Sequence, residues 1–359
     1  METEIQKITA EQIRPGCFRR AGELLRAGQT VAIPTETVYG LAAWIGSEEG
    51  IRRIYEAKGR PSDNPLIVHI YPGCPLGEIA AQVPELARPL MEAYWPGPMT
   101  LVMPKAPAIS PRITGGLDTV AVRMPSHPVA RALLTELKMP LVAPSANTSG
   151  RPSPTRAEHV FEDLKGRIPL ILDGGPCGVG LESTVIDVTG EKPVILRPGA
   201  ITKEMIEAVL GETEVDPAVT AGGMKDPKAV PRAPGMKYRH YAPQGKLTLL
   251  EGSSAWWGKM LEERPEPEKA WGLLLTRQLQ EDLQENRLVP PDVRIICLGD
   301  RDKPEELAAG LFGALREIDR AGIELAYGEA LSRAGLGEAV MNRFLKAAGG
   351  ELRREEEKA

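Results

Sequence analysis

Lys58-Gly59-Arg60-Pro61-Ser62-Asp63-Asn64-Pro65 leads directly into Leu66-Ile67-Val68-His69-Ile70. The first stretch is too broken by glycine and proline to form a helix, whereas the second has the apolar, β-branched composition of a buried strand. A polar loop with two cations at the start of a buried strand suits an anionic ligand held at the end of a sheet. Lys58 supplies a point charge and Arg60 a planar fork, and both suit phosphate oxygens. A solvated surface loop is the alternative, because short motifs often occur by chance.

The composition predicts a globular protein of two domains. The chain has 359 residues, 42% of them hydrophobic and 26% charged. A net charge of −5 argues against a general nucleic-acid binder, whose surface is usually basic. The four cysteines are far apart and form no Cys-Xaa-Xaa-Cys pair, which argues against a disulfide framework and against a zinc site, and no metal-binding residues are predicted. The absence of a signal peptide and of about 18 consecutive apolar residues predicts a cytoplasmic protein that does not enter membranes.

Several predicted strands end or begin in short polar clusters. A strand at 30–33 runs into Pro34–Leu41, which carries two threonines, a carboxylate and a tyrosine, and a strand near 141–143 runs into Ser145–Pro154. Arg123 lies on the strand face opposite two valines, where it either reaches solvent or faces a ligand cleft. Each cluster alone has the composition of an ordinary turn. In open α/β sheets ligands bind at the carboxyl ends of strands, so together the clusters predict one concave face suited to phosphates and a polar substrate.

The remainder of the chain divides by composition. We predict a catalytic domain over 1–212, a basic linker over 213–243, a small α/β domain over 244–350 and a frayed, charged tail over 351–359. Between Met224 and Tyr241 there are five cations and one acid, together with aromatic residues and a histidine, which favours a docking segment over a plain tether. Strands near 247–250, 271–275 and 293–298 alternate with helices, which predicts a parallel sheet of Rossmann-like type without a dinucleotide or P-loop motif.

The ordered motifs resemble those of the YrdC family, and in particular its two-domain members, the threonylcarbamoyl-AMP synthases. The resemblance extends over essentially the whole chain and is dense from 30 to 243. It rests on Pro34–Leu41, Lys58-Gly59-Arg60, Asn64-Pro65-Leu66, Trp95-Pro96-Gly97-Pro98, Asp118–Arg123, Pro144-Ser145-Ala146-Asn147, Glu182-Ser183-Thr184, Leu196-Arg197-Pro198-Gly199, Pro234–Pro243 and, more weakly, Met341-Asn342-Arg343.

The resemblance implies a twisted open α/β sheet with a concave basin, followed by a smaller Rossmann-like parallel α/β domain. It implies that L-threonine, bicarbonate and ATP, with Mg²⁺, give L-threonylcarbamoyladenylate and pyrophosphate. The product would pass to a threonylcarbamoyl transferase complex that acts on adenosine 37 of tRNA. The basic linker would fold over the basin as a lid that keeps water from the product.

The resemblance also assigns site residues. Lys58 and Arg60 would be catalytic and would bind ATP. The further residues expected at ATP are Ser62, Asn64, Ser145, Asn147, Ser153, Arg197, Arg239 and His240. Those expected at L-threonine are Thr35, Thr37, His69, Thr119, Arg123 and Ser183. None is an obvious general base, so we expect catalysis by positioning and charge stabilisation.

Two other functions remain open at this point. An RNA-binding module of the tRNA modification pathway could use the basin's cations on a nucleic-acid backbone, with weak tRNA contact, although the net charge and the few aromatic residues argue against it. A carbamoyltransferase related to hydrogenase-maturation proteins is the second alternative, and the absence of appended zinc-finger and acylphosphatase segments argues against that.

Overall fold

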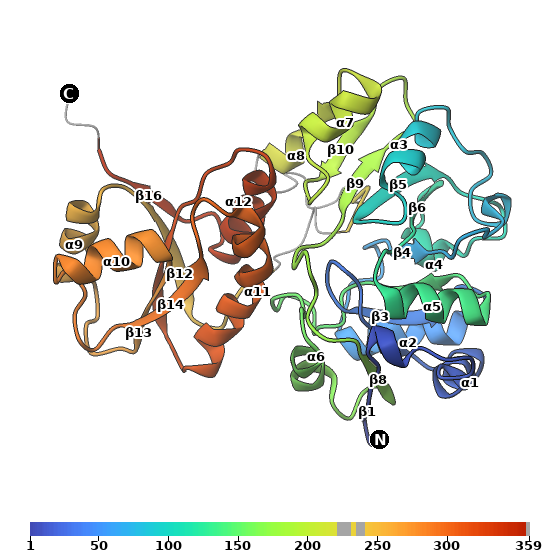
Figure 1. Cartoon of the computed structure of the whole chain (residues 1–359), viewed down its shortest axis with the longest axis horizontal. Coiled ribbons are helices and arrows are strands. Elements are labelled where there is room, and N and C mark those ends of the chain that lie inside the picture. The colour runs from blue at the N-terminus through green and yellow to red at the C-terminus, as the bar shows by residue number, and fades with distance from the viewer. Residues whose placement is uncertain (221–230, 235–240, 357–359) are drawn as a thin grey trace. The chain divides into compact units, whose positions relative to one another are not determined.

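The computed structural model describes residues 1–220, 231–234 and 241–356 (Figure 1). The chain forms two compact units. Unit 1 comprises Met1–Ser149 and Ser153–Tyr238, and unit 2 comprises Gly150–Pro152 and Arg239–Ala359. Arg239 and His240, which were expected at ATP, and much of the basic linker lie outside the described residues. The domain borders and the lid predicted from the sequence therefore stay predictions.

Unit 1 is built on one mixed sheet of 11 strands in the order β1-β8-β2-β3-β7-β4-β6-β5-β9-β10-β11. The edge strands β1 and β11 each pair in parallel with their neighbours β8 and β10. The pairs β2–β3, β3–β7, β4–β7, β5–β6 and β9–β10 are antiparallel. The strands are β1 (Glu4–Lys7), β2 (Val31–Ile33), β3 (Gly40–Trp44), β4 (Ile67–His69), β5 (Met99–Pro104), β6 (Thr119–Arg123), β7 (Leu141–Val142), β8 (Leu170–Asp173), β9 (Thr184–Asp187), β10 (Val194–Arg197) and β11 (Glu214–Val215).

Helices cover this sheet unevenly. The helices are α1 (Arg19–Arg26), α2 (Glu48–Lys58), α3 (Ala87–Tyr94), α4 (Pro111–Thr114), α5 (Pro128–Leu137), α6 (Ala157–Leu164), α7 (Lys203–Leu210) and α8 (Pro217–Thr220), with 3-10 turns at Ala10–Gln12 and Leu76–Glu78. One face packs against α2, α3, α6 and α7 in a large aliphatic core. On the other face α1 and α5 pack against strands β2, β3, β7 and β8.

A polar row continues the face that α1 and α5 cover. Leu141 of β7 packs with α1 and α5, and it pairs in register with His69 of β4. His69 pairs with Arg123 of β6, and Arg123 pairs with Thr100 of β5. Paired residues lie on the same face of a sheet, so the row His69–Arg123–Thr100 extends beyond the strands under α1 and α5. The predicted ligand-binding face stays a prediction, and we assign it to this part of the sheet.

A small apolar cluster lies on the same face beside the polar row. Ile67, Val102 and Ala121 belong to it, as does Ala233 from the described part of the linker. Val120 and Val122 lie in the large core on the opposite face. The alternation predicted around Arg123 is therefore confirmed, and the arginine does not reach solvent, since it is 3% exposed.

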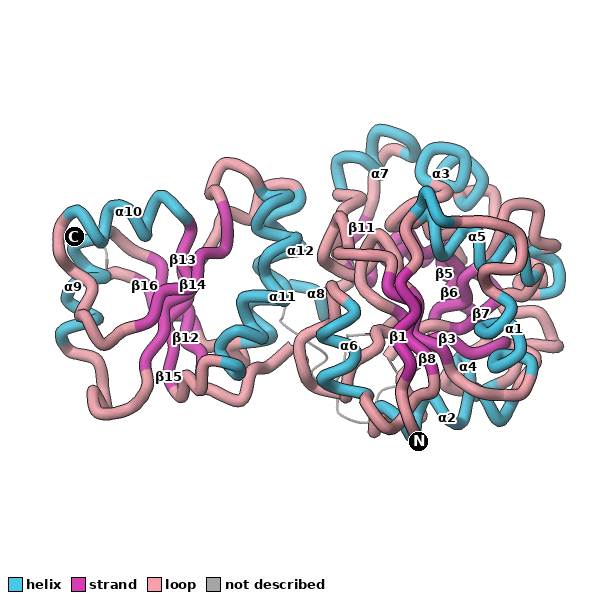
Figure 2. The backbone as a smooth tube through the Cα atoms, turned by 60° about the horizontal axis from the view of Figure 1, so that its bottom comes forward, coloured by secondary structure: helices cyan, strands magenta, loops and turns pink. Residues whose placement is uncertain are grey.

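Unit 2 has a parallel five-stranded sheet in the order β14-β13-β15-β12-β16, which confirms the predicted Rossmann-like class. Helices α9 and α10 pack on one face through Trp257, Leu261, Leu279 and Leu283, and α11 and α12 lie on the other (Figure 2). The elements are β12 (Lys246–Glu251), α9 (Ser254–Glu262), β13 (Trp271–Thr276), α10 (Arg277–Glu285), β14 (Arg294–Gly299), α11 (Pro304–Arg320), β15 (Leu325–Glu329), α12 (Leu336–Ala347) and β16 (Leu352–Arg354).

The predicted fraying from Glu351 onward is wrong for residues 352–354. These residues form β16, which pairs in parallel with β12, and Arg354 makes an ion pair with Glu251 at 2.8 Å. The backbone pairing orders a segment whose charge alone suggested a loose tail. No helix among the described residues is both long enough and apolar enough to cross a membrane.

Candidate functional site

The loop between β2 and β3 is fixed by its own threonines. Thr35 Oγ1 accepts hydrogen bonds from the backbone N–H groups of Thr37 and Val38, both at 3.2 Å, and donates to the Val38 carbonyl at 2.6 Å. The two hydroxyls of Thr35 and Thr37 lie 2.8 Å apart. A threonine side chain that bonds nearby backbone in this way stabilises a turn. The backbone N–H of Tyr39 donates to Pro154, so this loop is also joined to the segment that contains Ser145 and Ser153.

Lys58 is the last residue of α2. Ser47 caps the amino end of the helix and Gly59 caps its carboxyl end, where a φ of 61° is the left-handed conformation that favours glycine. Lys58 is 1% exposed, and its Nζ donates to the carbonyls of Ser145 at 2.5 Å and Asn147 at 2.6 Å. The Ser149 N–H donates to the Lys58 carbonyl at 2.8 Å. Lys58 therefore joins the end of α2 to the Ser145–Ser149 segment.

Burial lowers the pKa of the Lys58 amine well below its usual range, and the nearby Arg60 lowers it further. Asp163 and Glu182 oppose this shift. Arg60 itself holds the loop after α2, because its Nη2 donates to the Pro65 carbonyl at 2.9 Å. The two cations predicted to bind phosphate thus lie at one end of the sheet, and both also brace the loops on which they sit.

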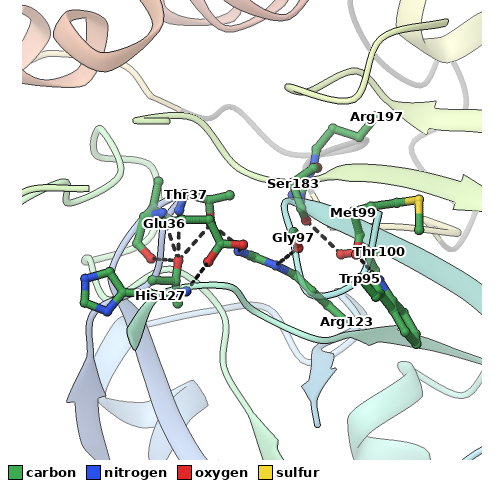
Figure 3. Close-up of polar contacts among 12 residues, drawn as sticks. Glu36, Thr37, Trp95, Gly97, Met99, Thr100, Arg123, His127, Ser183 and Arg197 are labelled. Carbon is green, nitrogen blue, oxygen red and sulfur yellow. Dashed lines mark hydrogen bonds and ion pairs between the residues drawn. The ribbon is translucent and has the colours of Figure 1, made fainter. Parts of the chain in front are cut away.

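Arg123 lies at the centre of a buried network (Figure 3). Its Nε donates to the Gly97 carbonyl at 3.2 Å, its Nη1 donates to Thr37 Oγ1 at 2.8 Å, and its Nη2 lies 2.6 Å from Glu36 Oε1. The last contact is an ion pair without hydrogen-bond alignment, because neither Nη2 nor Oε1 has an aligned hydrogen-bond partner among the described residues. The second Glu36 oxygen accepts from the His127 backbone N–H at 3.3 Å.

Ser183 is held by two side chains on the same side of the site (Figure 3). Its hydroxyl lies 2.7 Å from Thr100 Oγ1, and it accepts from Arg197 Nη2 at 3.2 Å. Arg197 Nε also donates to the Ser183 carbonyl at 3.1 Å. Gly199 permits this close packing, since a Cβ there would lie 2.4 Å from the Thr184 nitrogen. Arg197 therefore fixes both the backbone carbonyl and the hydroxyl of Ser183 by direct hydrogen bonds.

His69 is buried beside Arg123, and its Nδ1 lies 3.2 Å from the Ile67 carbonyl. Burial, reinforced by the Arg123 charge, lowers the pKa of His69 to about 3. Thr119 lies two residues before Ala121 on the same strand face and is partly exposed. The imidazole of His69 is thus neutral at physiological pH and can offer hydrogen bonds but no charge.

The remaining predicted residues differ in exposure. Ser153 is buried and donates to Glu182 Oε1 at 2.6 Å. Asn64 is 2% exposed, and its Oδ1 has no hydrogen-bond partner among the described residues. Ser62 is exposed. The structure thus joins Thr35, Thr37, Arg123 and Ser183 to one another or to neighbours at the polar row, whereas Ser62 lies at the surface of its loop.

Sequence reasoning assigned no role to three residues of this network: Glu36, Thr100 and Glu182. Each is buried or nearly so, and each partners a residue that was predicted, namely Arg123, Ser183 and Ser153. The Glu36 and Glu182 carboxylates stand inside the motifs themselves, which was an available signal. Thr100 carried none, since it lies 83 residues from Ser183 in the chain.

Comparisons with known proteins match both units. A family model for Sua5, YciO and YrdC proteins, described as "Telomere recombination", matches residues 23–199, and a model described as "Threonylcarbamoyl-AMP synthase, C-terminal domain" matches residues 201–349. A Bacillus subtilis protein named threonylcarbamoyl-AMP synthase is 47% identical over 334 residues, with 93% of each chain covered. The chain belongs to the Sua5–YciO–YrdC family.

Other members of the Sua5–YciO–YrdC family also match nearly the whole chain. A Pyrococcus abyssi protein of the same name is 46% identical, with 94% of this chain and 96% of that protein covered. The structure of P. abyssi Sua5 in complex with L-threonine has a TM-score of 0.89 and 43% identity, and the match covers 98% of this chain and 100% of that one. The family resemblance inferred from the motifs is thus confirmed, and the fold is that of a solved Sua5 protein.

Proposed function

We propose that this protein is a threonylcarbamoyl-AMP synthase, which makes L-threonylcarbamoyladenylate and pyrophosphate from L-threonine, bicarbonate and ATP. The observation that carries the proposal is the full-length similarity to a Sua5 structure that contains L-threonine. Relatives that match more than nine-tenths of the chain bear the name of this activity. The RNA-binding alternative is not favoured, because nothing in these similarities points to it.

The proposed chemistry is a nucleotidyl transfer. The amine of threonine takes up CO₂ derived from bicarbonate to form a carbamate. A carbamate oxygen then attacks the α-phosphorus of ATP, a new P–O bond forms, and the bond to pyrophosphate breaks. Charge builds up on the phosphate oxygens and on the leaving pyrophosphate, so fixed cations stabilise the transition state. We assign Lys58, Arg60 and Arg197 to this task, with Ser145, Asn147, Ser153, Asn64 and Ser62 as neutral donors and acceptors to the nucleotide.

We assign Mg²⁺ to the phosphates of ATP and not to a metal centre of the protein. Among residues 1–220, 231–234 and 241–356, no cluster of three or more His, Cys, Asp or Glu side chains could hold a metal ion. Mg²⁺ binds chiefly oxygen ligands and often keeps contact with substrate phosphates, where it would neutralise charge on the leaving group. The protein's own contribution is then to orient the nucleotide beside the carbamate.

We assign the polar row and its neighbours to threonine. Arg123 suits the substrate carboxylate, while His69 and the hydroxyls of Thr35, Thr119 and Ser183 suit its neutral groups. A neutral His69 does not add a second cation beside Arg123, in line with its low pKa. Catalysis by positioning follows, since threonine's amine reacts with CO₂ without strong activation. The product would pass to a cytoplasmic threonylcarbamoyl transferase complex for tRNA modification.

The test is pyrophosphate release with ATP, L-threonine or bicarbonate omitted in turn. We expect release only when all three are present, and we expect the adenylate to be found by mass spectrometry. Release that persists without threonine would overturn the proposal. Salt-sensitive binding of tRNA by the protein alone, without any adenylate formation, would support the RNA-binding alternative instead.

A further inference from the structure

Glu36 makes contacts that no predicted role for the site residues uses. Its side chain is 12% exposed and lies 2.6 Å from Arg123, whose side chain is 4% exposed. Burial is the largest single influence and raises the pKa of the Glu36 carboxyl, but the Arg123 charge and the hydrogen bonds to the carboxylate together outweigh it, and the net shift is downward. Glu36 is therefore ionised at neutral pH and forms a buried ion pair.

The ion pair spans the polar face of the sheet. Glu36 follows β2 and Arg123 ends β6, and β3, β7 and β4 lie between these two strands. Strand β6 runs antiparallel to β2, so the carboxyl ends of these two strands lie at opposite ends of the sheet, and the loop after β2 folds back across the sheet face to bring Glu36 to Arg123. The Val179 N–H donates to the Glu36 carbonyl at 2.7 Å. In Figure 3 the Glu36 carboxylate and the Arg123 guanidinium point toward each other, with Thr37 beside them.

Each Glu36 oxygen has a separate task. Oε1 faces Arg123, and Oε2 accepts from the His127 N–H at the start of α5. A carboxylate can accept at both oxygens, whereas a glutamine must present an NH₂ group to one of the two donors. Arg123 Nη2 has no aligned hydrogen-bond acceptor among the described residues, so its N–H groups can donate to a ligand.

We propose that Glu36 is a positioning residue that holds the Arg123 guanidinium for the carboxylate of the amino-acid substrate. This inference rests on the proposed function, because it takes threonine as the ligand of Arg123. The neutral partners of Arg123, the Gly97 carbonyl and Thr37, fix Nε and Nη1. Glu36 supplies the only charged partner that the described residues place at Nη2, and so sets the orientation of the fork.

The first experiment measures L-threonine binding by calorimetry, which does not require adenylate formation. For Glu36→Gln we expect the Kd for threonine to rise about ten-fold, as expected for the loss of a charge-assisted contact, with the Kd for ATP within about two-fold of wild type. Glu36→Asp keeps the charge but shortens the reach, and we expect an intermediate effect. Equal affinities of wild type and Glu36→Gln for threonine would overturn the inference.

The matched control is Glu329→Gln in unit 2. Glu329 is also buried, and it also pairs with an arginine, Arg301, at 2.7 Å. We expect this variant to lose thermal stability without any change in threonine affinity. A similar loss of threonine affinity in the control would assign the effect to general destabilisation.

A double-mutant cycle tests whether Glu36 acts through Arg123. In an Arg123→Gln background, Glu36→Gln should weaken threonine binding no further. Full additivity of the two effects would contradict the inference. If the Glu36 variants fail to fold, a crystal structure of wild type with threonine decides. Arg123 should then contact both Glu36 and the ligand carboxylate, and a carboxylate bound elsewhere would refute the proposal.

The outcomes also separate this inference from the proposed function. Wild type that binds threonine through Arg123 but releases no pyrophosphate would refute the synthase activity and leave the role of Glu36 intact. Wild type that releases pyrophosphate in a threonine-dependent manner, with unchanged behaviour of Glu36→Gln, would refute only the role of Glu36.

Discussion

His69 and Arg123 are register partners on the parallel strands β4 and β6, and both side chains are buried. Two effects disfavour the protonated form of a buried histidine beside a guanidinium: the loss of hydration and the repulsion between the two positive charges. This accounts for a His69 pKa of about 3 and keeps a single cation in that part of the polar row.

We predict that His69 does not titrate between pH 5 and pH 8. The Cε1–H resonance of His69, assigned by its loss in His69→Asn, should keep the shift of neutral imidazole over this range, because both burial and Arg123 disfavour its protonation. An NMR titration checks this directly. A midpoint near the ordinary value of about 6.5 would contradict it.

The same shift makes stability depend on pH. The unfolded chain binds a proton at His69 below about pH 6.5, whereas the folded chain does not until about pH 3. The free energy of unfolding should therefore fall as the pH drops below about 6.5, with a limiting slope of about 1.4 kcal/mol per pH unit from this residue. Urea unfolding at pH 7, 6 and 5 should show a smaller pH dependence in His69→Asn than in wild type. Equal slopes in the two proteins would count against the assignment.

Lys58→Met and Arg60→Ala should each reduce threonine- and bicarbonate-dependent pyrophosphate release by about 100-fold or more, because each removes a cation from the proposed phosphate site. Lys58→Met also removes the donor that joins α2 to the carbonyls of Ser145 and Asn147. Lys192→Met is the control, since Lys192 is exposed and pairs with Glu212. Near-normal turnover in both site variants would rule out the assignment.

Thr100→Val should raise the KM for threonine by about five-fold, which corresponds to the loss of one hydrogen bond. The substitution removes the hydroxyl that lies 2.7 Å from the Ser183 hydroxyl and changes the shape of the side chain little. The measurement is the KM for threonine against the KM for ATP. Thr189→Val is a control, as the Thr189 hydroxyl is exposed and bonds Asp187. An effect of equal size on both substrates would indicate a general distortion of the site.

Glu182→Gln should raise the KM for ATP by about ten-fold and act less on threonine. The Glu182 carboxylate accepts a hydrogen bond from the Ser153 hydroxyl, and its negative charge raises the pKa of Lys58. Removing this charge therefore lowers the pKa of Lys58 further. Lys58 then loses its proton at a lower pH, and the alkaline limb of kcat/KM for ATP should move to lower pH. The pH profile of Glu191→Gln, with its exposed side chain, should match that of wild type. An unshifted alkaline limb in Glu182→Gln would refute the coupling.

Local patterns in the sequence predicted the strands around the site and the face of Arg123. The run 66–70 contains β4, and the alternation at 119–123 is that of β6. Strand β3 was missed because Gly40–Trp44 is buried on both faces and shows no alternation, and β1 was missed because it is mostly exposed at an edge. The partners Glu36–Arg123 and Thr100–Ser183 depend on contacts across the sheet, and no local spacing encodes them.

The edge strand β1 has a consequence for the order of synthesis. Among the strands of the described residues, Glu4–Lys7 pairs with Leu170–Asp173 of β8 and with no other. At translation rates of about 5–20 residues per second, the first strand waits roughly 10 to 30 seconds before its partner has been made. A newly made chain therefore carries an unpaired, mostly polar N-terminal segment through most of the synthesis of unit 1. Charged side chains such as Glu4 and Lys7 disfavour edge-to-edge pairing with other chains, so we expect them to protect this segment until β8 has been made.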